Sequence, residues 1–62
     1  MTFESALLNS SYIYDPQAGS YMKEDSDGIL HTYMHIEDDV WNYEKYDEND
    51  KVLMSKSFSV TV

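Results

Sequence analysis

The sequence predicts a small, mainly β protein (α+β): an antiparallel meander of four or five strands with a short N-terminal helix. Three observations lead to this fold class. Short segments are rich in β-branched and aromatic residues, turn-forming residues separate them, and apolar and polar residues alternate near the C-terminus. The length of 62 residues allows one domain, residues 1–62.

The N-terminal residues predict one or two helical turns. Phe3, Ala6 and Leu7 have the i, i+3, i+4 spacing of an apolar helix face, and Thr2 is a suitable N-cap. An extended start is the alternative. The Asn-Ser-Ser sequence that follows is expected to end the helix, because these residues favour turns.

A series of strands and turns follows. The expected strands are Tyr12–Tyr14, Ser20–Lys23, Ile29–Ile36, Val40–Tyr46 and Val52–Val62. The expected turns are Asp15–Gly19, Glu24–Gly28, Glu37–Asp39 and Asp47–Lys51. Their Asp, Asn, Pro and Gly residues favour tight reversals, because proline presets φ and glycine takes positive φ without a Cβ clash.

The last segment has the clearest strand pattern. Its apolar residues fall on one face, namely Val52, Met54, Phe58, Val60 and Val62. This alternation predicts one dry face and one wet face, and only Lys56 interrupts the dry one. A dry face needs a cover, which the N-terminal helix or a second subunit can supply. Homodimerisation is therefore one expectation.

Two hairpins resemble each other within the chain. Residues 21–30 read YMKEDSDGIL, and residues 43–53 read YEKYDENDKVL, with one residue inserted. Each is expected to form a strand, an acidic turn and a second strand. Because two copies are too few for a repeat architecture, we interpret the similarity as a shared hairpin pattern.

The net charge limits the classes of partner. Twelve acidic residues oppose four lysines, and the formal net charge is −8. Such a charge repels nucleic acid and anionic membranes and attracts basic surfaces, so we expect a basic protein partner and neither direct nucleic-acid nor membrane binding. We do not expect the start to be a signal peptide, because it has no positively charged region and only a short apolar run. The sequence has no apolar stretch near the ~18 residues of a membrane span, and no cysteine. We therefore expect a cytoplasmic protein.

Metal, cofactor and catalytic sites are not expected. On a strand that rises ~3.3 Å per residue, His31 and His35 lie ~13 Å apart, too far to share one zinc ion. The acidic loops place Ile36 and Phe58 at the twelfth position, where calcium loops need a bidentate glutamate. Turn carboxylates are solvated and no nucleophile motif is present, so we expect no enzyme.

The aromatic content exceeds what a small core needs. The chain has six tyrosines and one tryptophan, residue types that are enriched at protein interfaces. Tyr33, Trp41 and Tyr43 are expected on one face of neighbouring strands. There they form either a second small core or a contact patch for a partner.

The acidic hairpin arm Glu37–Asp50 is the candidate binding surface. Carboxylates repeated every ~6.6 Å along one face of a strand, with acidic turns at the rim, can imitate the charge of a nucleic-acid backbone. Aromatic residues between the acids can anchor the partner. The candidate partner-binding residues are Glu37, Asp38, Asp39, Trp41, Tyr43, Glu44, Tyr46, Asp47, Glu48 and Asp50.

In size and composition the chain resembles small inhibitor proteins of phages and mobile elements. Examples are the DNA mimics that inhibit glycosylases or restriction enzymes, and the anti-CRISPR proteins. The resemblance implies an inhibitor that occupies the basic, nucleic-acid-binding surface of a partner protein, as in phage counter-defence. Three alternatives stay open: a structural or assembly module that self-associates through its sheet, a ligand or metal binder, and acids that only keep a small sheet soluble.

Overall fold

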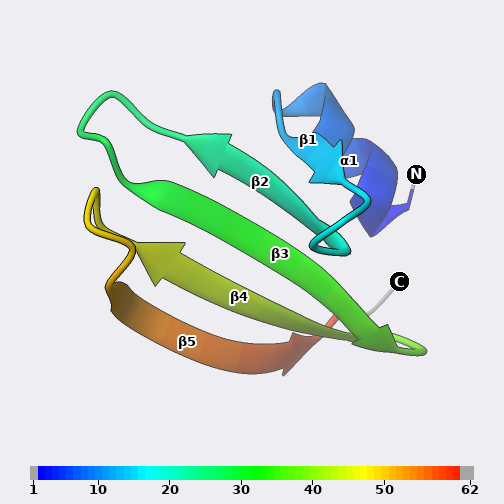
Figure 1. Cartoon of the computed structure of the whole chain (residues 1–62). Coiled ribbons are helices and arrows are strands. Elements are labelled where there is room, and N and C mark those ends of the chain that lie inside the picture. Colours follow the sequence, from blue (N-terminus) through cyan, green and yellow to red (C-terminus); the bar gives the residue numbers. More distant parts are fainter. Residues whose placement is uncertain (1, 61–62) are drawn as a thin grey trace.

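The computed structural model, which describes residues 2–60, contains a short helix and a five-stranded antiparallel sheet (Figure 1). The elements are α1 (Phe3–Asn9), β1 (Ile13–Asp15), β2 (Ser20–Glu24), β3 (Leu30–Glu37), β4 (Val40–Tyr46) and β5 (Val52–Ser59). The strands lie in chain order, β1-β2-β3-β4-β5, as a meander. The predicted fold class is therefore confirmed.

Helix α1 begins with the predicted cap. Thr2 has extended backbone angles, and its hydroxyl accepts a hydrogen bond of 3.1 Å from the backbone N–H of Ser5. The Ser5 side chain reaches back to the N–H of Thr2, so the two residues form a capping box. At the other end, the N–H of Ser10 donates to the carbonyl of Ala6 at 3.1 Å. The helical start is thus confirmed over the extended one.

Helix α1 packs on one face of the sheet, and this contact forms the core. The Phe3 ring meets the edges or faces of Trp41, Tyr33 and Phe58 at centroid distances of 4.8, 5.5 and 5.9 Å. Trp41 is 2% exposed, and Leu7 of the helix is 5% exposed. Aromatic pairs in such edge-to-face contacts add to the stability that burial gives.

The strand register decides which side chains share this covered face, here called the helix face. Tyr21 pairs with Tyr33, which pairs with Tyr43, and His35 pairs with Trp41. Because side chains alternate along a strand, these residues lie on the same side as α1. Tyr33 and Trp41 thus belong to a core beneath the helix, which answers the question that the sequence left open.

The prediction that β5 has one dry face is wrong. Val52 and Met54 are 48% and 43% exposed, because β5 is an edge strand and Phe58 is its contact with α1. The register also shifts, since Met54 pairs with Lys45 and Val52 pairs with Tyr46. Leu53 is the extra residue, and this irregularity places Val52 and Met54 on opposite faces. The predicted position of Val62 lies outside the described residues.

Within residues 2–60, no helix has the length and apolar character that are needed to cross a lipid bilayer.

Candidate functional site

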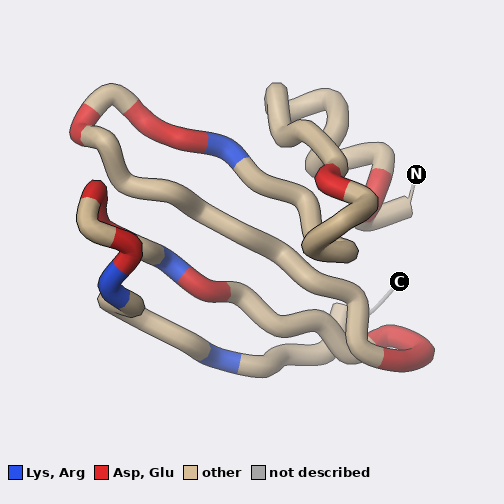
Figure 2. The backbone as a smooth tube through the Cα atoms, viewed as in Figure 1, with Lys and Arg blue, Asp and Glu red and all other residues tan. Residues whose placement is uncertain are grey.

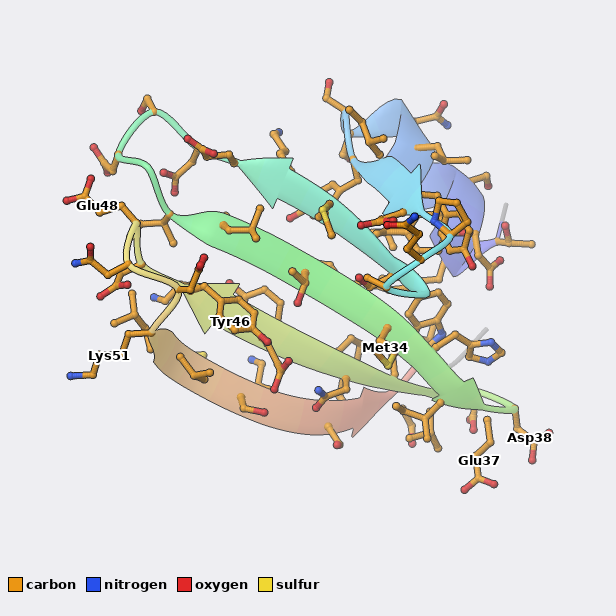
Figure 3. All side chains as sticks on the ribbon, viewed as in Figure 1. Met34, Glu37, Asp38, Tyr46, Glu48 and Lys51 are labelled. Carbon is orange, nitrogen blue, oxygen red and sulfur yellow. The ribbon has the colours of Figure 1, made fainter. Side chains whose placement is uncertain are left out.

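The predicted binding arm Glu37–Asp50 is extended, so its two acidic clusters lie far apart. Glu37, Asp38 and Asp39 end β3 and turn into β4, whereas Glu48 lies in the turn that follows β4 (Figure 3). Strand β4 has seven residues and separates the clusters by about 20 Å at its usual rise per residue. We call Glu37–Asp39 the distal turn.

The turn after β4 has the same backbone structure as the turn after β2. The backbone N–H of Asp47 donates to the carbonyl of Lys51 at 2.9 Å, and that of Asp25 donates to the carbonyl of Ile29 at 2.9 Å. The first carboxylate of each turn accepts two backbone N–H groups: Asp47 from Asn49 and Lys51, and Asp25 from Asp27 and Ile29. The similarity of the two hairpin sequences therefore corresponds to a shared turn geometry, in which the two turns match residue for residue. The extra residue of the second hairpin is Leu53, beyond the turn, where the register of β5 shifts.

These two turns lie side by side at one end of the sheet. A Cβ placed on Gly28 would lie 3.8 Å from the Glu48 carboxylate. Figure 2 shows the acidic residues of both turns at the same end. We call this group the acidic end, and it consists of Glu24, Asp25, Asp27, Asp47, Glu48 and Asp50. The meander topology causes this proximity, because alternate turns of a meander fall at the same end.

One carboxylate of the acidic end is tied to the helix face. Asp25 contacts Nε2 of His31 at 2.9 Å, and Nδ1 of the same ring lies 2.7 Å from the hydroxyl of Tyr43. The hydrogen bond to His31, with backbone N–H groups of Ile29 and Asp27, lowers the pKa of Asp25 below its ordinary value. Burial raises the pKa of Tyr43, and the charges of Tyr33 and Asp25 add to this effect.

Three of the four lysines lie on the helix face. Lys23, Lys45 and Lys56 pair in register with helix-face residues, so their side chains lie on the side of α1. Within residues 2–60 no lysine forms an ion pair with a carboxylate, and the ion pair that is present joins His31 and Asp25. The fourth lysine, Lys51, follows Asp50 in the turn at the acidic end, whereas nine of the twelve acids lie at the two ends of the sheet (Figure 2).

The sheet face opposite α1, here called the open face, has a hollow of ≈ 280 Å³ at its centre. Met34 and Tyr46 lie on this side in Figure 3. Most of the lining is apolar or uncharged, and the two charged groups are Glu44 and Asp50. The lining residues are Ala18, Ser20, Met22, Leu30, Thr32, Met34, Asn42, Glu44, Tyr46 and Asp50. We call this hollow the central groove.

Glu44 is held firmly within the central groove. Its Oε1 accepts the hydroxyl of Tyr46 at 2.5 Å, and its Oε2 accepts the hydroxyl of Ser55 at 3.1 Å. The hydrogen bond to Glu44 is the main cause that raises the pKa of Tyr46, with burial and the negative charge adding to it. The carboxylate thus has a fixed position at the border of β4 and β5.

The predicted aromatic anchors do not form one patch. Trp41 is 2% exposed beneath α1, and Tyr43 is half-buried on the same face. Tyr46 is also half-buried but lies on the open face, in the central groove. An indole contact of Trp41 with a partner therefore requires α1 to move, whereas Tyr46 is within reach of a ligand in the groove.

The two histidines have separate environments. His35 stacks on Trp41 at 4.9 Å between ring centroids, and its Nε2 lies 2.6 Å from the carbonyl oxygen of Asp38. His31 instead bonds Asp25 and Tyr43. Within residues 2–60, no group of three or more His, Asp or Glu residues is placed to hold a metal ion.

Sequence reasoning missed two parts of this surface. It did not bring Asp25 and Asp27 next to Glu48, although the hairpin similarity and the meander order together imply that contact. It also did not find the central groove, which Leu30, Thr32 and Met34 help to line. The missing information is the face on which α1 packs, because the other face of the sheet is then left uncovered.

Comparison with known proteins gives no relative from which a function can be transferred: no protein-family model matches this chain, and neither a curated protein nor a solved structure is significantly similar to it.

Proposed function

We propose that this protein is a small cytoplasmic inhibitor that binds a basic, nucleic-acid-binding surface of a partner protein. The observation that carries the proposal is the acidic end, where two turns of the same geometry place carboxylates side by side, and no lysine among residues 2–60 forms an ion pair with them. Such a field attracts and orients a basic partner and repels nucleic acid itself. The composition, which resembles that of phage counter-defence inhibitors, agrees with this role.

The positions of the acids favour contact with a partner through two clusters and not through a row of carboxylates along one strand. Strand β4 carries Glu44 in its interior, and the other acids of the predicted arm lie in the turns or at a strand end. A basic surface is therefore contacted at the acidic end and at the distal turn, about 20 Å apart by the length of β4. This spacing suits a partner that normally contacts separated phosphates.

Two matched variants test the proposal. Glu24→Gln/Asp27→Asn/Glu48→Gln neutralises the acidic end, and none of these side chains makes a hydrogen bond that holds its turn. Glu37→Gln/Asp38→Asn/Asp39→Asn makes the same charge change in the distal turn. Partners are captured from lysate at low and high salt and identified by mass spectrometry. We expect the acidic-end variant to lose basic partners that the wild type retains at low salt.

The proposal fails if the acidic-end variant retains every partner, or if the captured proteins are not basic. Equal losses in both variants would instead show that the two acidic clusters contribute equally to binding.

The edge of β5 favours a second candidate, a module that self-associates through its sheet. Strand β5 is an eight-residue edge with exposed Val52, Leu53 and Met54. Such an edge is a template for pairing with a second copy, and Lys56 is the charge that opposes it. Sedimentation at increasing concentration tests this role. A dimer that survives high salt and disappears in Met54→Lys supports it, and a monomer at all concentrations contradicts it.

A further inference from the structure

The central groove has room for a single side chain of a partner. Its volume of ≈ 280 Å³ lies just below the ~300–1,000 Å³ of typical small-molecule pockets, and it is open to solvent on one side. Met22, Leu30 and Met34 supply an apolar lining. Such a lining suits an aliphatic stem that ends in a polar group.

Glu44 supplies the polar end of the groove. A carboxylate has about four acceptor positions, two on each oxygen. The hydroxyls of Tyr46 and Ser55 take one position on each oxygen, so one acceptor stays free on Oε1 and one on Oε2. Two parallel acceptors match the planar donor fork of a guanidinium, whereas an ammonium is a point charge without this geometry.

The charge of the open face decides which of two molecules can cover it, a second copy of this chain or a basic protein. Within residues 2–60, the strand residues on this face include Glu24 and Glu44 but no lysine, and Asp50 lies at the border of the groove. The open face of a second copy carries the same charges and is repelled. An arginine of a basic protein is attracted, and its stem can cover the methionine and leucine side chains.

We propose that the central groove binds one arginine side chain of the basic partner, with its guanidinium paired to both oxygens of Glu44. This inference rests on the proposed function and names the contact that gives it specificity. Arginine is the common residue of nucleic-acid-binding surfaces, so the groove selects such surfaces over merely lysine-rich ones. The acidic end then supplies attraction at a distance, and the groove supplies the bound contact.

Two synthetic peptides of equal charge test the arginine site. One is a capped octapeptide of alternating alanine and arginine, and the other has lysine in place of arginine. Calorimetric titration of the whole chain at low salt is expected to give about tenfold tighter binding of the arginine peptide, the effect of one extra charge-assisted hydrogen bond. Glu44→Gln is expected to remove this preference.

Two further variants complete the test. Met34→Trp fills the groove without a charge change, and Met34 is exposed enough to accept the substitution. It is also expected to remove the preference. Asp38→Asn removes the same charge as Glu44→Gln, but in the distal turn, and is expected to keep the preference. Urea unfolding of each variant, followed by far-ultraviolet circular dichroism, confirms that it is folded.

The inference is overturned if the wild type binds both peptides equally, or if both groove variants retain the preference. Binding without a preference leaves the acidic clusters as the contact, so the proposed function survives that result. If neither peptide binds at low salt, both the groove site and the proposed function are contradicted.

Discussion

Gly28 and Asp50 occupy the same position in two turns of the same geometry. The N–H of Gly28 donates to the carbonyl of Asp25 at 3.1 Å, and the N–H of Asp50 donates to that of Asp47 at 3.0 Å. Both residues have left-handed backbone angles, with φ of 80° and 64°. Glycine adopts this conformation freely, whereas a residue with a Cβ is strained in it. Aspartate is strained less than most such residues.

Asp50→Gly is therefore expected to stabilise the protein. Relief of the left-handed strain, less the entropy that glycine loses on folding, leaves a gain of about 0.5 kcal/mol in the free energy of unfolding. Urea unfolding measures this change. Asp50→Asn is the matched control, because it removes the same charge but keeps a Cβ. If the two variants are equally stable, the gain comes from relieved charge repulsion and not from the backbone.

Acid is expected to weaken the turn that Asp25 holds. The pKa of Asp25 in the folded protein is lowered, first by the hydrogen bond to His31, so the folded state binds this proton less tightly than the unfolded state. The stabilisation is present above the unfolded pKa, near 3.8, and is lost as the pH falls through the lowered folded pKa. Thermal unfolding between neutral and acid pH measures the loss.

Asp25→Asn is expected to flatten this dependence of stability on pH. Asp27→Asn serves as its control, because it removes a charge from the same turn but leaves the acceptor of the turn intact. An unchanged acid profile in Asp25→Asn would mean that other carboxylates cause the loss of stability.

Alkaline pH is expected to destabilise the protein through its tyrosines. The pKa of Tyr46 is raised by its hydrogen bond to Glu44, and burial raises those of Tyr12 and Tyr43. The folded state therefore holds these protons more tightly than the unfolded state. The stabilisation is complete below the unfolded pKa, near 10.0, and is lost as the pH rises through the folded pKa.

Tyr46→Phe isolates one of these contributions. It removes the hydroxyl that Glu44 accepts and is expected to cost about 1 kcal/mol at neutral pH. It also removes the contribution of Tyr46 to the loss of stability at alkaline pH. Urea unfolding at neutral and at alkaline pH measures both effects. Tyr14→Phe is the control, because that tyrosine is exposed on the short strand β1. Equal effects of the two substitutions would contradict the role of the contact with Glu44.

Local chemistry made most of the fold predictable from sequence. The helix follows from Thr2 as N-cap, and the turns follow from residues such as Asp25 and Gly28, whose side chain or backbone freedom determines the reversal. Alternation then gave the faces of β3 and β4. It failed at Leu53, because one extra residue in a strand exchanges the two faces of the residues that follow. Such a bulge is not visible in the order of apolar and polar residues.

The candidate site was less predictable, because it depends on contacts between distant segments. Acids in the turns were visible in the sequence, but the proximity of Gly28 to Glu48 depends on the order of the strands. Burial of Trp41 depends on the position of α1 on the sheet. The contact between the rings of Phe3 and Trp41 fixes that position. An interface tryptophan and a core tryptophan have the same sequence signal, so only their packing separates them.

The packing of Trp41 gives a prediction that separates its two roles. Trp41→Ala removes the largest buried side chain beneath α1 and is expected to cost about 3–5 kcal/mol, enough to unfold a domain of this size. Trp41→Phe keeps an aromatic ring against Phe3 and is expected to stay folded with a smaller loss, as thermal unfolding measures. Because Trp41 is a core residue on the face opposite the groove, the folded Phe variant is expected to bind the arginine peptide as the wild type does. Loss of that binding in a folded Trp41→Phe protein would instead identify the indole as a direct partner contact.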